Sequence, residues 1–184
     1  IASRSFGSVQ INIAKREITL VGVDSNGHGV AAVMSVEVKP GNGLVLVNIN
    51  DILADYNTQY SARTAAQVAG NYTNKDLSKI DIVYHIKANA TIIAGPSAGA
   101  NMAISTIALL QNKTLNPNVI MTGAISPNGT IEEVGAIVEK AKAAKSRNAT
   151  LFLVPTGLGT QITEYEKQVS CGTLDHSKYC EVVY

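Results

Sequence analysis

The chain has 184 residues, which is long enough to bury a sizeable core and fits a single domain, expected to span residues 1–184. Its 15 Lys and Arg residues balance 14 Asp and Glu residues, so no large field of one sign is available and no nucleic-acid partner is expected. Hydrophobic residues make up 46% of the chain, which excludes a disordered protein, and no apolar run approaches the roughly 18 residues of a membrane span.

Alternation of apolar and polar residues predicts strands in the first part of the chain. It is clearest at residues 9–13 and 36–38, and turn-forming residues between such segments predict a meander of about four strands. The pattern changes to helical spacing over residues 58–69, where Gly70 is predicted to end the helix. A new strand is predicted at residues 80–86.

Helices and strands alternate in the second half of the chain. A largely buried helix is predicted at residues 98–110, because this stretch is mostly small or apolar and holds no proline. Strands at residues 119–125 and 150–154 flank a second helix at residues 134–147. The order indicates the α+β class, with an N-terminal β-meander followed by alternating strands and helices.

Cys171 and Cys180 lie near the C-terminus. Their spacing suits a disulfide that closes a small loop in the C-terminal tail, and two reduced thiols are the alternative. The chain begins with Ile1 rather than Met, from which we expect that an upstream segment has been removed, and a signal or membrane anchor is one candidate for it. Together with several Asn-x-Thr glycosylation patterns, these features favour an extracytoplasmic or membrane-anchored location, facing outside, over a cytoplasmic one.

Metal and nucleotide sites are not expected in this sequence. The three histidines, His28, His85 and His176, are scattered and lack metal-ligand spacing. The sequence contains no phosphate-binding loop motif, and the glycines around Ser97 lack the spacing of a dinucleotide fingerprint. No cofactor is therefore predicted.

Ser97 lies in a Gly-Pro-Ser-Ala-Gly segment at residues 95–99, where a loop turns into the helix predicted at residues 98–110. Small residues around the hydroxyl let a substrate backbone approach, and the N–H groups of the first helical turn can stabilise an oxyanion beside it. The position therefore suits a nucleophile. The alternative is a helix N-cap, in which the hydroxyl binds one of those N–H groups.

A serine nucleophile needs a base, and the sequence offers histidine or lysine. Asp81 and His85 precede Ser97, but residues four apart in a strand are separated by about 13 Å, so Asp81 cannot orient the His85 ring. Lys140 has only apolar neighbours at the helical i±3 and i±4 positions, whereas those of Lys142 are mostly polar. Burial would favour the neutral amine of Lys140. The alternative is that the Lys140 stem packs while its amine reaches water.

These features together resemble the proteolytic domain of the Lon proteases, a family of Ser-Lys dyad peptidases. The segment at residues 95–99 resembles the serine motif of the family, and Lys140 lies in a matching lysine motif. Met-Thr-Gly at residues 121–123 is similar to a family element whose threonine contacts the catalytic lysine. The strand and proline at residues 151–155 also match, and the resemblance is clearest over residues 80–155.

The resemblance implies the fold of that domain and a role for each matching residue. Ser97 would be the nucleophile and Lys140 the general base. Thr122 would orient Lys140, and the backbone N–H groups of Ser97 and Ala98 would form the oxyanion site. His85 stands at the position of a family histidine and would line the cleft or support the serine loop.

The resemblance also implies an endopeptidase that cleaves unfolded or extended polypeptides. The sequence contains no ATPase module, so hydrolysis is expected without ATP. A homo-hexamer, an upstream membrane anchor or a separate ATPase are the partners expected beside the polypeptide substrate. Ala94 replaces an acidic residue of many ATP-dependent members, so regulation by that acid is absent or replaced. The alternatives are a non-catalytic member that binds a peptide or partner, and a peptidase that processes only itself.

Overall fold

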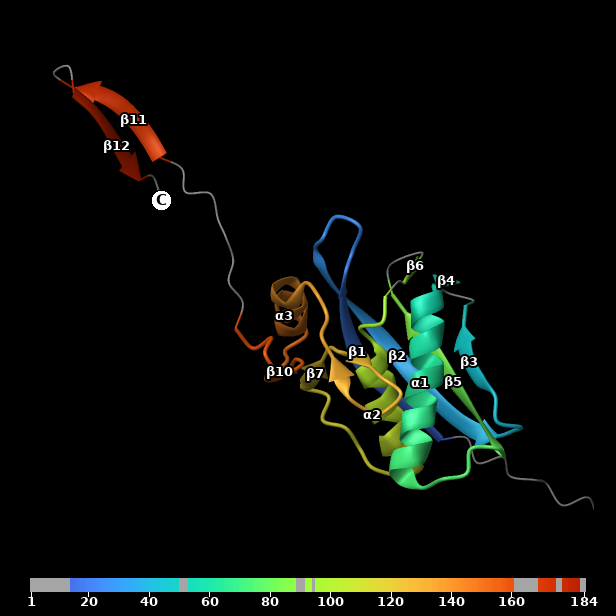
Figure 1. The fold of residues 1–184 in the computed structure, drawn as a ribbon. Helices are drawn as coiled ribbons and strands as arrows, with labels where there is room; N and C mark the ends of the chain where they lie inside the picture. The colour runs from blue at the N-terminus through green and yellow to red at the C-terminus, as the bar shows by residue number, and fades with distance from the viewer. Residues whose placement is uncertain are drawn as a thin grey trace, which may run out of the picture.

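The computed structural model describes residues 14–49, 53–88, 92–93, 95–160, 169–174 and 177–182 (Figure 1). Strands and helices are mixed, which confirms the α+β class predicted from the sequence. In chain order the elements are β1 (Ala14–Val23), β2 (Gly29–Pro40), β3 (Val45–Asn48), β4 (Leu53–Ala54), α1 (Tyr56–Thr73), β5 (Ile80–Lys87), β6 (Ile92–Ile93), α2 (Gly99–Leu110), β7 (Val119–Met121), β8 (Ala124–Ile125), β9 (Ile131–Glu132), α3 (Ile137–Ser146), β10 (Leu151–Leu153), β11 (Val169–Leu174) and β12 (Ser177–Val182).

Four strands form the main sheet, in the order β1-β2-β5-β3. β1 and β2 form an antiparallel hairpin, and β2 also pairs antiparallel with β5. The predicted meander therefore holds for β1 and β2. β3 differs, because it pairs in parallel with β5 rather than with β2, and α1 supplies the crossover that a parallel pair requires. The strand predicted at residues 9–13 lies outside the described residues.

The main core lies between the sheet and the two helices α1 and α2, which cover one of its faces (Figure 1). Alternate residues of the strands point into it, among them Met34, Val36 and Ile86. The buried side of α1 consists largely of alanine and small hydroxyl residues, which lets α2 pack closely beside it. Tyr84 is fully buried, and a 2.8 Å hydrogen bond with Thr106 Oγ1 satisfies its hydroxyl, while burial raises the pKa of the phenol.

α1 is longer than its sequence pattern predicts. It begins after Asp55, whose side chain accepts the N–H of Thr58 as an N-cap. The predicted stop at Gly70 is wrong, because the helix continues past it and ends at Asn74, which adopts the left-handed conformation with φ 55°. Gly70 serves close packing instead, since a Cβ there would lie 2.9 Å from Leu77 Cδ1.

β7, α3 and β10 form a second layer beside the main sheet (Figure 1). β7 and β10 pair in parallel, and α3 is the crossover between them. α3 packs against β1 and β2. At this contact Val21 joins Ile120, Ala143 and Ala144 in a second apolar cluster, which ties the two layers together.

The start of α3 differs from the predicted range of residues 134–147. The helix spans Ile137–Ser146, and Ala136 at its N-cap position has a left-handed φ of 56°. Left-handed backbone interrupts the helical hydrogen-bond pattern, so the preceding residues lie in a loop. Such a conformation costs a non-glycine residue about 1–3 kcal/mol, which the surrounding packing must offset.

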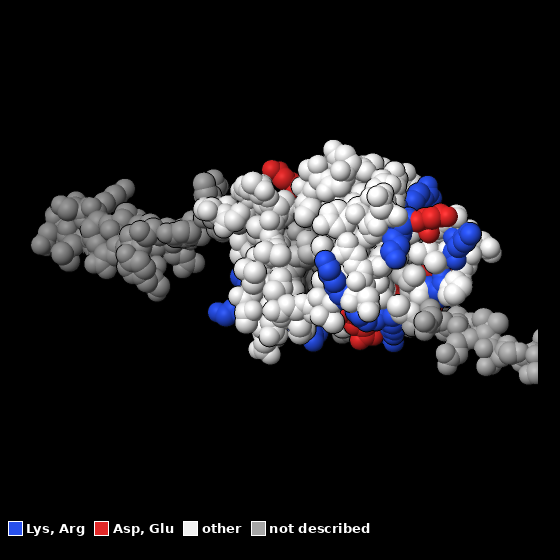
Figure 2. Space-filling model, turned by 90° about the horizontal axis from the view of Figure 1, so that it is seen from below, with Lys and Arg blue, Asp and Glu red and all other residues white. Residues whose placement is uncertain are grey.

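The described surface carries charges of both signs. In Figure 2 most Lys and Arg side chains on this face gather toward one side together with Asp and Glu, and a broad area beside them carries no charge. Among the helices of the described ranges, none is long and apolar enough to cross a membrane.

Candidate active site

Ser97 lies in the turn that leads into α2, and it does not cap the helix. Gly95 begins this turn with a φ of 96°, a conformation that suits glycine. The N-cap position belongs to Ala98 and has no side-chain hydrogen bond. Within the residues that the structure describes, the half-buried Ser97 hydroxyl has no hydrogen-bond partner. This favours the nucleophile interpretation over the helix-cap alternative.

Two backbone N–H groups beside the Ser97 hydroxyl have no partner among the described residues. Gly99 N donates back into the turn at 2.9 Å, and Ala100 N donates to Gly123 O at 3.0 Å. The N–H groups of Ser97 and Ala98, by contrast, find no acceptor in the described part of the chain. They lie at the start of α2, where the partial positive charge of the helix is concentrated, so they can stabilise an oxyanion.

The segment that follows β7 holds the serine turn from the other side. Gly123 N donates to Ser97 O at 3.1 Å, and Thr122 Oγ1 donates to the same oxygen at 3.4 Å. Thr122 is buried, and its N–H donates to Leu153 O of β10 at 3.0 Å. The structure therefore brings Thr122 and Ser97 together and links both to the β7–β10 pair.

Lys140 is a buried lysine on α3, with only 4% of its surface exposed. No carboxylate of the described ranges lies within ion-pair distance of its amine, and burial lowers its pKa from the ordinary 10.5. Lys142 is exposed and pairs with Glu139 at 3.4 Å. Helical spacing therefore predicts correctly which of the two lysines is buried. Burial without a counter-ion favours the neutral amine that a general base needs.

The chain topology places Lys140 at the Thr122 end of β7. A helix that connects two parallel strands runs antiparallel to them, so α3 is expected to start toward the end of the strand pair where β7 ends. Ala143 and Ala144, one turn further along α3, share an apolar cluster with Ile120 in the middle of β7. Lys140, one helical turn earlier, is therefore expected nearer to Thr122, although no hydrogen bond within the described ranges joins Lys140 to Thr122 or to Ser97.

A comparison with known protein families decides the identity of this fold. The sequence profile of the Lon protease C-terminal proteolytic domain matches residues 23–176. The chain belongs to the Lon protease family. The matched part is the proteolytic domain, which places the chain among the serine peptidases and confirms the family and fold expected from the sequence.

Individual Lon proteases are similar over much of this chain. Lon protease 1 of Borreliella burgdorferi is 28% identical over 163 residues, which cover 83% of this chain and 20% of that protein. The Lon protease of Lachnoclostridium phytofermentans is 27% identical over 148 residues, 78% of this chain and 18% of the relative. The mitochondrial Lon protease homolog of Saccharomyces cerevisiae is 39% identical over 82 residues, 45% of this chain and 7% of the relative. The chain spans a fifth or less of these proteins.

In this Lon proteolytic domain, His85 belongs to the main sheet. Its Nδ1 lies 2.9 Å from Nδ2 of Asn48, within hydrogen-bond distance. Nε2 faces Glu37 Oε2 at 3.7 Å. Asp81 accepts backbone N–H groups of the turn before β3, so it does not pair with His85. Within the described ranges no hydrogen bond links His85 to Ser97, and its supporting role stays a prediction.

Asp55 contacts the serine turn of the Lon domain, and sequence reasoning missed it. Its Oδ2 accepts the N–H of Gly95, two residues before Ser97, at 3.2 Å. The available sequence signal is an Asp three residues ahead of Thr58 at a helix start, which predicts local capping. It does not predict a contact with a residue 40 positions away, which only the fold creates.

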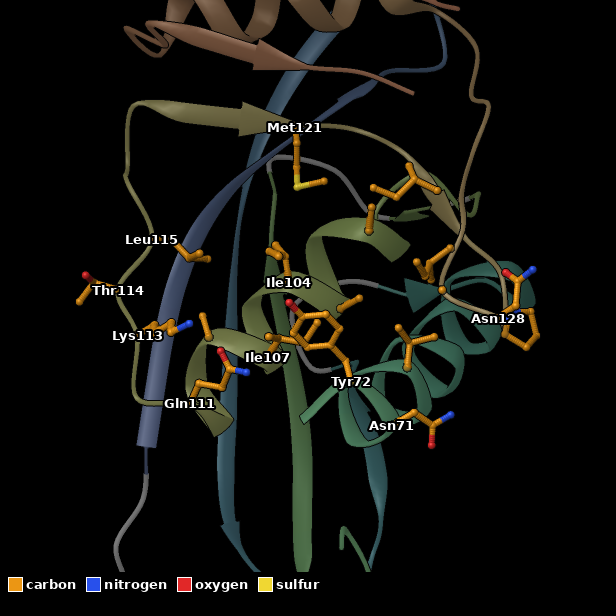
Figure 3. Close-up of a pocket in the computed structure, with 18 residues that line it drawn as sticks. Asn71, Tyr72, Ile104, Ile107, Gln111, Lys113, Thr114, Leu115, Met121 and Asn128 are labelled. Atoms are coloured by element: carbon orange, nitrogen blue, oxygen red, sulfur yellow. The ribbon is translucent and has the colours of Figure 1, made fainter. Parts of the chain in front are cut away.

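An apolar pocket of ≈ 670 Å³ runs along α2 of the Lon domain (Figure 3). Ile104 and Ile107 of α2, Tyr72 of α1 and Met121 of β7 line it. Since successive residues of an extended chain point to opposite sides, Met121 faces this pocket whereas Thr122 faces Ser97. The pocket and the serine turn therefore lie on opposite sides of the same segment, and the pocket suits apolar groups.

Proposed function

We propose that this chain is a Ser-Lys endopeptidase that hydrolyses unfolded or extended polypeptides without ATP. The observation that supports the proposal most strongly is the burial of Lys140, without a counter-ion in the described ranges, on the helix that begins at the Thr122 end of β7. Thr122 in turn donates to the Ser97 carbonyl oxygen. A hydroxyl and two N–H groups without partners in the described ranges, together with a base of lowered pKa, are the parts that acyl transfer needs.

The proposed cycle has two halves that share one base. Neutral Lys140 accepts the Ser97 proton as Oγ attacks the peptide carbonyl carbon, and the N–H groups of Ser97 and Ala98 stabilise the oxyanion. Lys140 then gives the proton to the leaving amine, which breaks the C–N bond and leaves an ester on Ser97. Water, deprotonated by Lys140, hydrolyses the ester and restores the hydroxyl. Thr122 orients Lys140 throughout.

The substrate is proposed to be a polypeptide segment in an extended conformation, because proteases of this family act on polypeptides. Main-chain hydrogen bonds along a strand edge would hold such a segment. A homo-hexameric ring is the proposed assembly. A separate ATPase or an upstream membrane anchor are proposed partners of the whole protein.

Hydrolysis of an unfolded protein without ATP, measured from about pH 6 to pH 10, tests the proposal. The expected result is cleavage whose rate rises with an apparent pKa below the 10.5 of an ordinary lysine. A peptide boronate should form an adduct with the wild-type chain and not with Ser97→Ala, since boronates mimic the tetrahedral intermediate of an attacking hydroxyl. A folded sample that cleaves nothing would favour the non-catalytic alternative, and cleavage of its own chain alone would favour self-processing.

We also propose that Cys171 and Cys180 form a disulfide, which supports an extracytoplasmic location. They are register partners in the β11–β12 hairpin, where opposed Cα atoms lie about 4.5–5.5 Å apart, within the range of disulfides. In protein purified from its native host without reductant, iodoacetamide is expected to label neither cysteine until a reductant is added. Mass spectrometry measures the labelling. Two labelled cysteines in the unreduced protein would favour the cytoplasmic alternative.

A further inference from the structure

Asp55 connects the start of α1 to the turn that carries Ser97. As the N-cap of α1, its Oδ1 accepts the Thr58 N–H at 2.8 Å and the Thr58 hydroxyl at 2.7 Å. Its Oδ2 accepts the N–H of Gly95 at 3.2 Å, with a longer contact from Asn57 Nδ2 at 3.5 Å. The two oxygens of one carboxylate therefore serve two elements that are 40 residues apart.

Buried hydroxyls of α1 lie against the carbonyl groups of the same turn. Thr58 Oγ1 lies 3.4 Å from Gly95 O, and Ser61 Oγ lies 3.5 Å from Pro96 O. Thr58 and Ser61 are both buried, and a buried hydroxyl costs stability unless it is hydrogen-bonded. α1 thus presents polar groups to the serine turn at positions where core packing alone would favour alanine.

The position of Gly95 controls that of Ser97, because only Pro96 separates them. Proline fixes its own φ near about −65°. Gly95 has a φ of 96°, which glycine reaches without strain but which it does not hold by itself. A fixed Gly95 N–H therefore fixes the direction in which the chain enters α2. The Ser97 hydroxyl and the N–H groups of Ser97 and Ala98, which have no partner in the described ranges, come next in the chain, so their positions depend on this direction.

The Asp55 side chain is ionised at neutral pH. Burial raises its pKa, but hydrogen bonds from Thr58, Gly95 and Asn57 outweigh this effect and hold the pKa below the ordinary 3.8. The ionised carboxylate accepts hydrogen bonds at both oxygens. An asparagine in its place has one oxygen and one NH₂ group. Its NH₂ group would therefore face another donor, either the Thr58 N–H at the start of α1 or the Gly95 N–H.

We propose that Asp55 is a positioning residue of the peptidase, whose carboxylate sets the Ser97 turn through the Gly95 N–H without touching the substrate. This inference rests on the proposed function. A misplacement of the reacting atoms by about 1 Å lowers a catalytic rate by about 10²-fold. Loss of this one hydrogen bond therefore acts on kcat and not on the KM for peptide.

Two substitutions separate positioning from helix capping. Asparagine and serine are good N-caps, so Asp55→Asn and Asp55→Ser keep the start of α1 but lose one of the two acceptors. The expected result is a kcat lower by about tenfold to hundredfold, with KM and the thermal midpoint close to wild type. Asp76→Asn is the matched control, because Asp76 also accepts from a local turn, at Ser78, and should change neither constant.

Amide hydrogen exchange at Gly95 gives a second readout that does not depend on catalysis. Exchange at this N–H should be faster in Asp55→Asn than in the wild type and in Asp76→Asn. If exchange at the Gly95 N–H is the same in Asp55→Asn as in the wild type, the inference is overturned. This readout needs no catalysis, so it still applies if the wild-type chain has no peptidase activity. That result would contradict the proposed function alone. A wild-type kcat in Asp55→Asn also overturns the inference. If the loss of kcat in Asp55→Asn is fully explained by a smaller fraction of folded protein, Asp55 only caps α1 and does not position Ser97.

Discussion

Replacing Lys140 by methionine is expected to lower the rate of peptide hydrolysis by about 10²–10⁴-fold, the range that a positioned general base supplies. Methionine keeps the length and the apolar stem of the side chain but cannot accept a proton. The residual rate should also lose its rise with pH, because no amine with a lowered pKa remains. Steady-state kinetics with one peptide substrate, measured over a range of pH, follow both effects.

The same substitution is expected to leave the fold intact and to change how stability depends on pH. Burial lowers the pKa of Lys140 below 10.5, so the folded state binds this proton less tightly than the unfolded state. The wild-type free energy of unfolding should therefore rise as the pH rises from the lowered pKa towards 10.5. Lys140→Met should lack this rise and should be as stable as wild type, or more stable, at about pH 7 in urea denaturation.

Lys142→Met is the matched control for this experiment. Lys142 lies on the same helix, but it is exposed and pairs only with Glu139 among the described residues. Its loss should change the rate and the stability little, because an exposed ion pair contributes about 0–1 kcal/mol. If Lys140→Met keeps the wild-type rate, or if both variants lose activity equally, Lys140 is a packing residue and not the general base.

The parts of the site that the sequence predicts are those set by local geometry. The helical neighbours of Lys140 and Lys142 are fixed by the turn of a helix, so spacing alone distinguishes the buried lysine from the exposed one. Ser97 is equally local, since Gly, Pro and small residues mark a turn into a helix. The Asp55 contact with Gly95 depends on how α1 packs on the serine turn, and no periodicity encodes it.

The fold follows the same division between local and non-local interactions. Alternation predicts that β3 is a strand but not that its partner is β5, because the crossover through α1 decides the pairing. Gly70 signals a helix end, yet it is a buried interior residue of α1 whose missing side chain leaves room for Leu77. The left-handed Ala136 has no sequence signal, since alanine disfavours this conformation, and tertiary packing must hold it.

The two proposed catalytic side chains come from different layers of the molecule. Ser97 stands at the start of α2 and Lys140 is carried by α3, and both helices pack against the β1–β2 hairpin of the main sheet. Their relative position therefore depends on how closely α3 approaches that hairpin. The tightest approach among the described glycines of β1 and β2 is at Gly29, where a Cβ would collide with the backbone oxygen of Glu139, the residue before Lys140.

Gly29→Ala is consequently expected to move α3 and to reduce both stability and activity. The added methyl group would also lie 2.8 Å from the Glu139 carbonyl carbon, and this backbone atom cannot yield without a shift of the helix. Overpacking of this kind costs about 1–3 kcal/mol in the free energy of unfolding. The remaining folded protein should lose about 10²-fold in kcat, because Lys140 moves with Glu139 away from Ser97. Urea denaturation and single-substrate kinetics measure the two losses.

Gly22→Ala makes the same chemical change on the same hairpin without the collision. Gly22 pairs with Val30 beside Gly29, and a Cβ at this position meets nothing within 4 Å. Alanine also reduces the conformational freedom of the unfolded chain, so stability should be unchanged or higher by about 0.4–1 kcal/mol. If Gly29→Ala matches Gly22→Ala in stability and kcat, the contact of α3 with the hairpin does not set the Lys140 position. If only Gly29→Ala loses both, the spacing between the two layers determines whether the dyad assembles.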